Sequence, residues 1–258
     1  MSSREYVIVG ALSYRAGAYA LDKFLENHKE IQKRYPSSYM LLATKEKDFI
    51  DELKEMLTRW GLRGEVMLYD VVKPDYASSW VWNVACGREM MRQYVLSQAT
   101  ASHLFLIDTD MTCDPNVINI LTKEIEGYDI VVSGYPGRLN VTGTGGIGCS
   151  LFTRDALQKI KFRCYEFDNH VVIDEGVVLE MDSFSKRLRF KRGYFVAIDH
   201  YYDSDGSSKH IEPHSVNMLR KISNSLLVRY ILIRTSLIFK HNIPDSLQQL
   251  LSRFFKHP

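Results

Sequence analysis

The 258-residue sequence lacks a strong charge of either sign, a cysteine framework and a long hydrophobic run. Lysine and arginine total 33 against 31 acidic residues, and the net charge of +2 argues against a nucleic-acid partner. The four cysteines have no CxxC spacing and the N-terminus does not resemble a signal peptide, which predicts a reducing, cytoplasmic location. The most apolar stretch, residues 226–239, contains two arginines and is shorter than the ~20 residues that cross a bilayer, so no transmembrane helix is predicted.

The charge is nevertheless divided unevenly along the chain. Residues 216–258 carry seven basic side chains and one acidic one, a net of +6, which leaves −4 for residues 1–215. This basic segment is also rich in Leu, Ile and Phe, a composition typical of helices that lie on a membrane surface. Helices that pack on the body or form a dimer can have the same pattern. We therefore expect a globular body over 1–215 and a basic amphipathic helical tail over 216–258. If the tail lies on a membrane surface, we expect the protein at the cytoplasmic face of that membrane.

Short apolar runs alternate with amphipathic ones over the first 135 residues, which predicts an α/β fold. Strands that are apolar throughout indicate a mostly parallel sheet flanked by helices on both faces. Such sheets bind ligands beyond the carboxyl ends of their strands, so polar residues after the first and fourth strands are the first candidates for a site. The expected strands are 6–12, 39–43, 66–69, 103–107 and 128–132, and the expected helices are 18–34, 47–60, 80–96 and one that begins at Asp114-Pro115.

Two carboxylates, Asp108 and Asp110, directly follow the expected strand 103–107. Residues two apart on an extended chain point the same way, so both can face one ion, and carboxylate oxygens suit Mg²⁺ or Mn²⁺. An ion held there could bridge a diphosphate and neutralise charge on a leaving nucleoside diphosphate. The alternative is that two acids merely end a strand and begin a turn.

A glycine-rich segment, 142–148, follows the fifth expected strand. Gly143, Gly145 and Gly148 satisfy GxGxxG formally, but an apolar run and not a helix comes next, which argues against a dinucleotide fingerprint. Glycines such as Gly145 and Gly146 allow a ligand to approach the backbone closely, or they form an ordinary loop.

Residues 180–193 have the pattern of a helix with Asp182 in its first turn and Gly193 past its end. An acid at that position favours the positive end of the helix dipole, which is an alternative to a catalytic role for Asp182.

Taken together, these features resemble the GT-A glycosyltransferases, most closely those of the family 2 type, over most of the chain from the first strand to about His210. The resemblance has two departures. Met181 stands where the family has the Glu of a Glu-Asp pair, and 43–46 lacks the acid that usually reads the nucleobase. Four segments carry the resemblance: a helix start with an arginine (82–89), a strand followed by Asp-x-Asp (104–110), a Gly-rich strand with a short helix (146–157), and the segment from Asp182 to Gly193-Tyr194.

The resemblance implies a GT-A, Rossmann-like fold and a metal-dependent transfer of sugar from a UDP- or GDP-sugar to the hydroxyl of a glycan, lipid-linked or protein acceptor. It implies that Asp182 is the catalytic base, and a base that activates the acceptor implies inversion at the anomeric carbon. Glu180, Glu175 and Asp174 are the alternatives for this role. It also implies that Mn²⁺ or Mg²⁺ is bound by Asp108, Asp110 and His210, with His200 as the alternative histidine. The residues expected to contact the donor are Ala11, Ser13, Tyr14, Arg88, Asp108, Gly145 and Gly146.

Two other functions are compatible with the sequence. A sugar-phosphate nucleotidyltransferase could use a similar sheet and metal, but it would favour a Gly-rich, basic loop after the first strand, and residues 13–17 are a poor version of one. A non-catalytic, membrane-attached binding module would explain the unusual tail.

Overall fold

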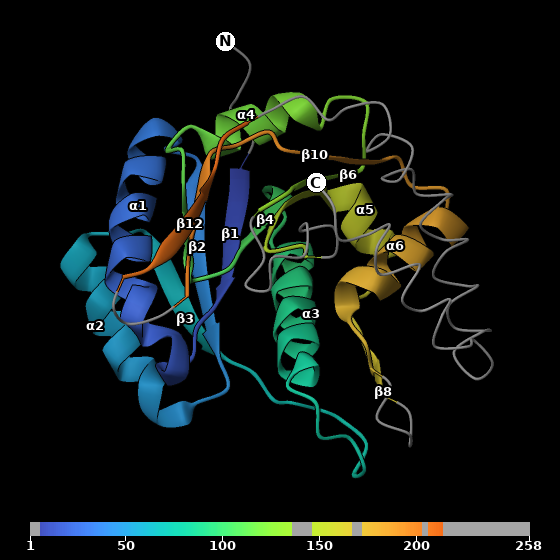
Figure 1. Ribbon diagram of the computed structural model, residues 1–258, viewed down its shortest axis with the longest axis horizontal. Coiled ribbons are helices and arrows are strands. Elements are labelled where there is room, and N and C mark those ends of the chain that lie inside the picture. Colours follow the sequence, from blue (N-terminus) through green and yellow to red (C-terminus); the bar gives the residue numbers. More distant parts are fainter. Residues whose placement is uncertain (1–5, 136–145, 167–171, 203–205, 214–258) are drawn as a thin grey trace, which may run out of the picture.

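The computed structural model describes residues 6–135, 146–166, 172–202 and 206–213, and its centre is a seven-stranded sheet (Figure 1). The strand order is β10-β6-β7-β4-β1-β2-β3, and β7 alone among these strands runs against its neighbours. The predicted mostly parallel sheet is therefore confirmed. The strands are β1 (Tyr6–Leu12), β2 (Ser38–Thr44), β3 (Gly64–Leu68), β4 (Ala101–Ile107), β6 (Ile130–Ser133), β7 (Cys149–Thr153) and β10 (Phe190–Gly193).

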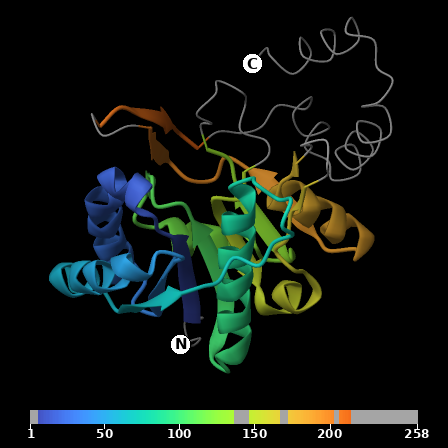
Figure 2. The same ribbon diagram turned by 90° about the horizontal axis from the view of Figure 1, so that it is seen from below.

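Helices cover both faces of this sheet (Figure 2). One core cluster joins the sheet to α1, α2 and α4, and a second joins it to α3, α5 and α6. The helices are α1 (Leu21–Arg34), α2 (Ile50–Trp60), α3 (Val81–Ser97), α4 (Val117–Glu124), α5 (Arg154–Lys159) and α6 (Glu175–Ser185), with 3₁₀ turns η1 (Arg15–Ala20) and η2 (Lys47–Phe49).

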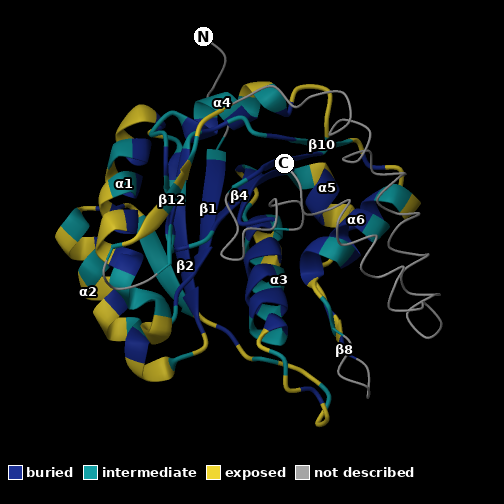
Figure 3. Ribbon diagram, in the orientation of Figure 1, coloured by how far each residue is buried: buried dark blue, intermediate teal, exposed yellow. Residues whose placement is uncertain are grey.

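The side chains of β1 show why its sequence is apolar throughout. Val7 and Val9 pack in the first cluster and Ile8 in the second, so successive residues are buried on opposite faces. The central strands are buried, whereas the outer faces of α1 and α2 are exposed (Figure 3). Gly10 permits close packing here, because a Cβ at that position would lie 2.7 Å from the sulfur of Met91 on α3.

Two small antiparallel sheets complete the described structure. In the first, of order β12-β11-β5, β11 (Ile198–Tyr201) lies between β5 (Met111–Cys113) and β12 (Ser208–Ile211). The register pairs His200 with Met111, which brings β11 beside the turn that follows β4. The second is the pair β8 (Tyr165–Glu166) and β9 (Val172–Ile173), which immediately precedes α6.

The expected helix over 180–193 is wrong in its position. Helix α6 begins at Glu175, because the Asp174 side chain caps it by accepting a hydrogen bond of 2.9 Å from the Val177 amide. Asp182 therefore lies in the second half of α6 and not in its first turn. The chain then turns at Arg187, whose φ is 55°, and pairs with β6 as β10.

Two further expectations concern residues that the structure does not describe. Gly145 and the tail over 216–258 lie outside the described residues. Within the part that is described, no helix is long and apolar enough to cross a membrane.

Candidate functional site

The turn after β4 holds Asp108 and Asp110 at the carboxyl edge of the sheet. Thr109 lies between them and donates a hydrogen bond of 2.9 Å to the Leu12 carbonyl at the end of β1. The Met111 amide donates to the Asp108 carbonyl and closes the turn. The two carboxylates therefore stand on a fixed turn between the two central strands, where ligands bind in sheets of this kind.

Arg88 of α3 joins two carboxylates that come from distant parts of the chain. Its guanidinium lies 2.7 Å from Asp108 Oδ1 and also forms an ion pair with Glu175 Oε1 at the start of α6. The Arg88 side chain is 6% exposed. Burial lowers the Arg88 pKa, but the two carboxylates more than offset that effect, so the pKa lies above its ordinary value and the guanidinium stays charged. Burial raises the pKa of Glu175, and Arg88 opposes that rise.

The start of β7 approaches this turn through glycine. The Asp108 amide donates to the Gly148 carbonyl, and a Cβ on Gly148 would overlap the Asp108 carboxylate. A Cβ on Gly146 would overlap the hydroxyl of Tyr135, which the sequence analysis missed. Burial raises the pKa of Tyr135, and the nearby Asp108 adds to the rise, so the phenol stays protonated. The glycines are therefore needed for packing against Asp108 and Tyr135, whatever else they contact.

Asp110 contacts one of the two candidate histidines. His200 Nε2 lies 3.2 Å from Asp110 Oδ2, and both side chains are largely buried. The His200 ring packs against Tyr135 and Tyr202, with ring centroids 5.6 and 4.9 Å away. The Tyr201 amide donates to the Asp110 carbonyl at 2.8 Å, which fixes β11 to the turn. Residues about 90 positions apart are thus brought together by the small sheet.

His210 lies in a different environment. It is exposed on β12, with one ring nitrogen 2.8 Å from Asp199 and the other 2.8 Å from Glu212. Hydrogen bonds to Glu212 and Asp199 raise its pKa above the ordinary histidine value. The structure brings His200, and not His210, into contact with Asp110.

Few protein side chains at this edge are placed to bind a metal ion. Within the described residues, no three His, Cys, Asp or Glu side chains converge as a complete metal site. Asp110 offers a carboxylate oxygen and His200 an imidazole nitrogen, whereas one Asp108 oxygen already binds Arg88. Mg²⁺ in phosphate-transfer sites is commonly bound by one or two carboxylates together with substrate phosphates. The pair therefore fits a cation whose coordination is completed by a bound diphosphate.

The carboxylates of α6 are divided between different partners. Asp182 lies two turns beyond Glu175, about 10 Å along the helix axis. Its Oδ1 lies 2.9 Å from Arg163 and its Oδ2 3.3 Å from Lys186. Glu180 forms a buried ion pair of 2.6 Å with Arg192. Within this helix, Glu175 is the carboxylate that shares a partner with Asp108.

The residues at the end of β1 contribute unequally to the edge. Ala11 is 1% exposed and packs in the core, and Ser13 is also buried. The Tyr14 hydroxyl lies 2.6 Å from that of Tyr69, and burial raises the pKa of Tyr14 to about 12. Arg15 binds Glu52 and the Asp48 carbonyl, so the segment 13–17 directs its only guanidinium toward α2 and not toward the edge.

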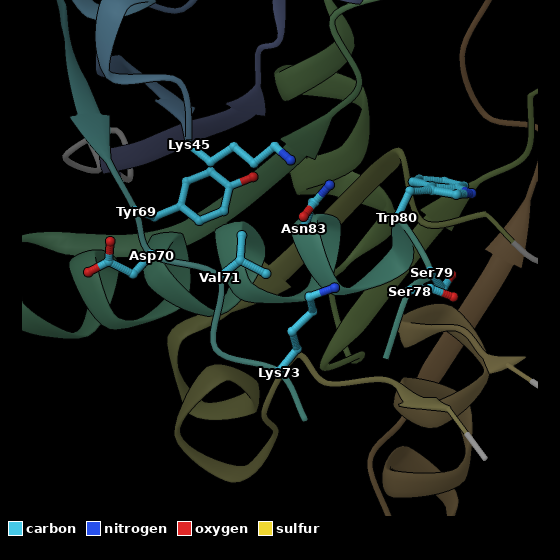
Figure 4. A pocket seen from close by; sticks show the side chains of 9 residues that line it. All are labelled: Lys45, Tyr69, Asp70, Val71, Lys73, Ser78, Ser79, Trp80 and Asn83. Carbon is cyan, nitrogen blue, oxygen red and sulfur yellow. The ribbon is translucent and has the colours of Figure 1, made fainter. Parts of the chain in front are cut away.

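A cavity of about 480 Å³ opens beside this tyrosine pair (Figure 4). It lies between the end of β2, the segment after β3 and the start of α3, and Figure 4 shows the Lys45 amine extended beside the Tyr69 ring and toward Asn83. The sequence analysis did not select this cavity, although Tyr69 ended an expected strand. The lining residues are Lys45, Tyr69, Asp70, Val71, Lys73, Ser78, Ser79, Trp80 and Asn83.

Comparisons with known proteins support the fold. No protein-family model matches the sequence, and no curated protein matches it. Among solved structures, glucosyl-3-phosphoglycerate synthase from Mycobacterium tuberculosis, in complex with Mn²⁺ and UDP-glucose, is 13% identical, with a TM-score of 0.51 over 94% of this chain and 81% of that one. The mannosyltransferase PcManGT from Pyrobaculum calidifontis, in complex with GDP-Man and Mn²⁺, is 14% identical, with a TM-score of 0.50. That match covers 74% of this chain but only 55% of the mannosyltransferase.

Both matches are too distant in sequence to show more than the architecture. This chain therefore has the GT-A glycosyltransferase fold.

Proposed function

We propose that this protein is a divalent-metal-dependent glycosyltransferase that moves a sugar from a nucleoside-diphosphate sugar to an acceptor hydroxyl. The observation that carries the proposal is the contact between Asp110 and His200 beside the Asp108–Arg88–Glu175 cluster. A nucleotide-sized cavity opens at the same edge of the sheet. The two solved structures with this fold described above hold Mn²⁺ together with UDP-glucose or GDP-Man.

Asp110 and His200 would hold the cation, either Mn²⁺ or Mg²⁺. When bound, it would supply a positive charge that neutralises the diphosphate leaving group. Arg88 holds Asp108 in place through its ion pair, and Gly148 leaves room for that carboxylate.

The nucleoside of a UDP- or GDP-sugar donor would occupy the cavity beside Tyr69. Lys45 could donate hydrogen bonds to a base carbonyl, because an ammonium group is a donor without acceptor capacity. Guanine and uracil both present such carbonyl oxygens. The role expected for Tyr14 becomes indirect, since its hydroxyl holds Tyr69, which lines the cavity.

The base that removes the acceptor proton would be a carboxylate of α6. The acceptor oxygen would then bond to the anomeric carbon as the bond to the nucleoside diphosphate breaks, and this single displacement inverts that carbon. The resemblance assigns this role to Asp182. The geometry favours Glu175, because Glu175 shares Arg88 with Asp108, and because its Oε2 atom is buried and makes no hydrogen bond within the described residues. Both oxygens of Asp182 lie near cations instead. A carboxylate with a raised pKa is suited to accept a proton near neutral pH.

The acceptor would be a glycan, a lipid-linked molecule or a protein. We further propose that residues 1–215 form the transferase body and that the basic tail, 216–258, attaches it to an anionic membrane surface. The charge of the tail supports this arrangement.

Substitutions of Asp110 and of the two candidate histidines test the metal site. His200→Ala and Asp110→Ala should each abolish the Mn²⁺-dependent part of nucleoside-diphosphate binding, measured by calorimetry with UDP and GDP, and also sugar transfer from a radiolabelled donor. His210→Ala is the matched control, because it removes an exposed imidazole from the neighbouring strand. Mn²⁺-dependent affinity that survives in Asp110→Ala, or that is lost only in His210→Ala, would contradict the assignment.

A further inference from the structure

Glu166 on β8 is a nearly buried carboxylate that receives several hydrogen bonds from one short segment of the chain. Both of its oxygens lie 3.1 Å from the Ser78 amide, and Oε2 also lies 3.1 Å from the Ser79 amide. The Ser78 hydroxyl donates to Oε1 at 3.2 Å, and the Trp82 indole donates to Oε2 at 3.0 Å. These bonds, led by that from the Ser78 amide, hold the pKa of Glu166 below its ordinary value. The group is therefore an ionised acceptor.

The segment that Glu166 holds is one wall of the cavity. Ser78, Ser79, Trp80 and Asn83 all line the cavity, and they form the entry to α3. The residue before α3, Trp80, provides no side-chain cap. Glu166 binds the amides of Ser78 and Ser79, which precede α3, and its negative charge near the helix N-terminus interacts favourably with the helix dipole.

The segment that leads into the wall, and Trp80 within it, has several exposed apolar side chains. Val72, Tyr76 and Trp80 are 77%, 58% and 70% exposed, whereas Ala77 is buried. Lys73 adds a hydrogen bond to the Ala77 carbonyl, but this bond lies within the same segment. Val81 of the wall packs with Ala85 and with Cys164, the residue before β8, in a small cluster that Trp82 also contacts. Polar contacts with Glu166 therefore add to this small cluster in joining the wall to β8.

We propose that Glu166 is a positioning residue for nucleotide binding, which fixes the wall from Ser78 to Asn83 against β8. The inference rests on the proposed function, since it takes the cavity as the nucleoside site. Because β8 pairs with β9, which directly precedes α6, the same carboxylate also links the nucleoside wall to the helix that begins at Glu175. Nucleotide affinity should therefore depend on a residue that does not line the cavity.

Glu166→Gln tests this role with little change in shape. The amide keeps one acceptor oxygen but presents NH₂ to backbone donors that need an acceptor. Asp129→Asn is the matched control. Asp129 also accepts a hydrogen bond from the backbone amide of a distant residue, Arg189, at 2.7 Å, but it lies just before β6, at the end of the sheet opposite to the carboxyl edge. Trp82→Phe is a milder second variant, which removes one hydrogen bond and keeps an aromatic ring.

The measurement is the calorimetric affinity for UDP and GDP with Mn²⁺, at a temperature where circular dichroism shows each variant to be folded. Glu166→Gln should weaken binding about tenfold or more, since several charge-assisted hydrogen bonds to the wall are lost. Trp82→Phe should weaken it about twofold to threefold, and Asp129→Asn should bind as the wild type does. In turnover, the donor KM of Glu166→Gln should rise far more than kcat falls.

Four results would overturn the inference. Wild-type affinity in a folded Glu166→Gln protein would show that the wall does not need this carboxylate. An equal loss in Asp129→Asn would show a general effect of destabilisation. If Glu166→Gln does not fold, wild-type affinity in Trp82→Phe gives the same negative answer. A wild-type protein that binds neither nucleotide would refute the proposed function, and the role of Glu166 with it.

Discussion

Replacing His28 with leucine should make the protein more resistant to acid. His28 lies on the inner face of α1, is 0% exposed and stacks on Phe24, with ring centroids 4.2 Å apart. Its Nδ1 lies 3.1 Å from the Phe24 carbonyl, which can only accept, so Nδ1 carries the proton of the neutral ring. Nε2 is buried and makes no hydrogen bond within the described residues. A second proton would therefore place a charge among apolar side chains.

The magnitude follows from the pKa. Burial lowers the pKa of His28 to about 4 from an ordinary value of 6.5. Between these two values the unfolded chain binds a proton that the folded protein does not, so the free energy of unfolding falls as the pH falls. This one group should cost the wild type about 2 kcal/mol between pH 8 and pH 5, an order-of-magnitude figure. A leucine at position 28 does not titrate, so the variant should not show this loss.

Urea unfolding of both proteins at pH 8, 6.5 and 5 measures the effect. The stability of His28→Leu relative to wild type should increase by about 2 kcal/mol from pH 8 to pH 5. His210→Gln is the control, because the pKa of exposed His210 is raised, so its contribution is present at low pH and is lost as the pH rises. A difference between His28→Leu and wild type that is the same at pH 5 and pH 8 would refute the reasoning.

Three further predictions concern the site and the tail. Arg88→Met should lower the free energy of unfolding by about 3 kcal/mol, because two carboxylates lose their shared partner. Adding Glu175→Gln to this variant should restore part of the lost stability. Equal stability of the wild type, the single variant and the double variant in urea would contradict this. Replacing the carboxylate of the catalytic base with an amide should reduce turnover about 10²-fold or more while donor binding is kept. The kinetics of Glu175→Gln and Asp182→Asn therefore identify the base, and a greater loss in Asp182→Asn would assign the role to Asp182. In co-sedimentation across a salt series, full-length protein should bind anionic vesicles better than a 1–216 chain, since each basic residue near the surface adds about 1 kcal/mol; equal binding would exclude attachment by the tail.

The central sheet could be predicted because its strands are buried on both faces. The expected strand over 6–12 coincides with β1, and the apolar run before Asp108 placed that residue at a strand end. The short strands β5, β11 and β12 could not be predicted in this way. They contain three or four residues each, too few for a hydrophobic period to be visible.

The contacts within the site depended on this unpredicted part. His200 and His210 lie on neighbouring antiparallel strands, and only the register with β5 shows which one reaches Asp110. The start of α6 did carry a local signal, since Asp174 before Glu175 fits a helix cap followed by an acid in the first turn. The pairing of Arg88 with Glu175 is a tertiary contact between residues 87 positions apart, and no spacing rule predicts it.

The cluster at the carboxyl edge also has a thermodynamic consequence. Asp108, Asp110 and Glu175 bring three carboxylates to a place where Arg88 supplies one permanent positive charge. A nucleoside diphosphate is itself an anion, so these carboxylates repel its phosphates until a counter-charge arrives. Cation and nucleotide should then bind with positive cooperativity, and by linkage each must strengthen the other by the same factor. At low cation concentration the donor would bind more weakly, so the free cation level would set how much of the protein is loaded with donor.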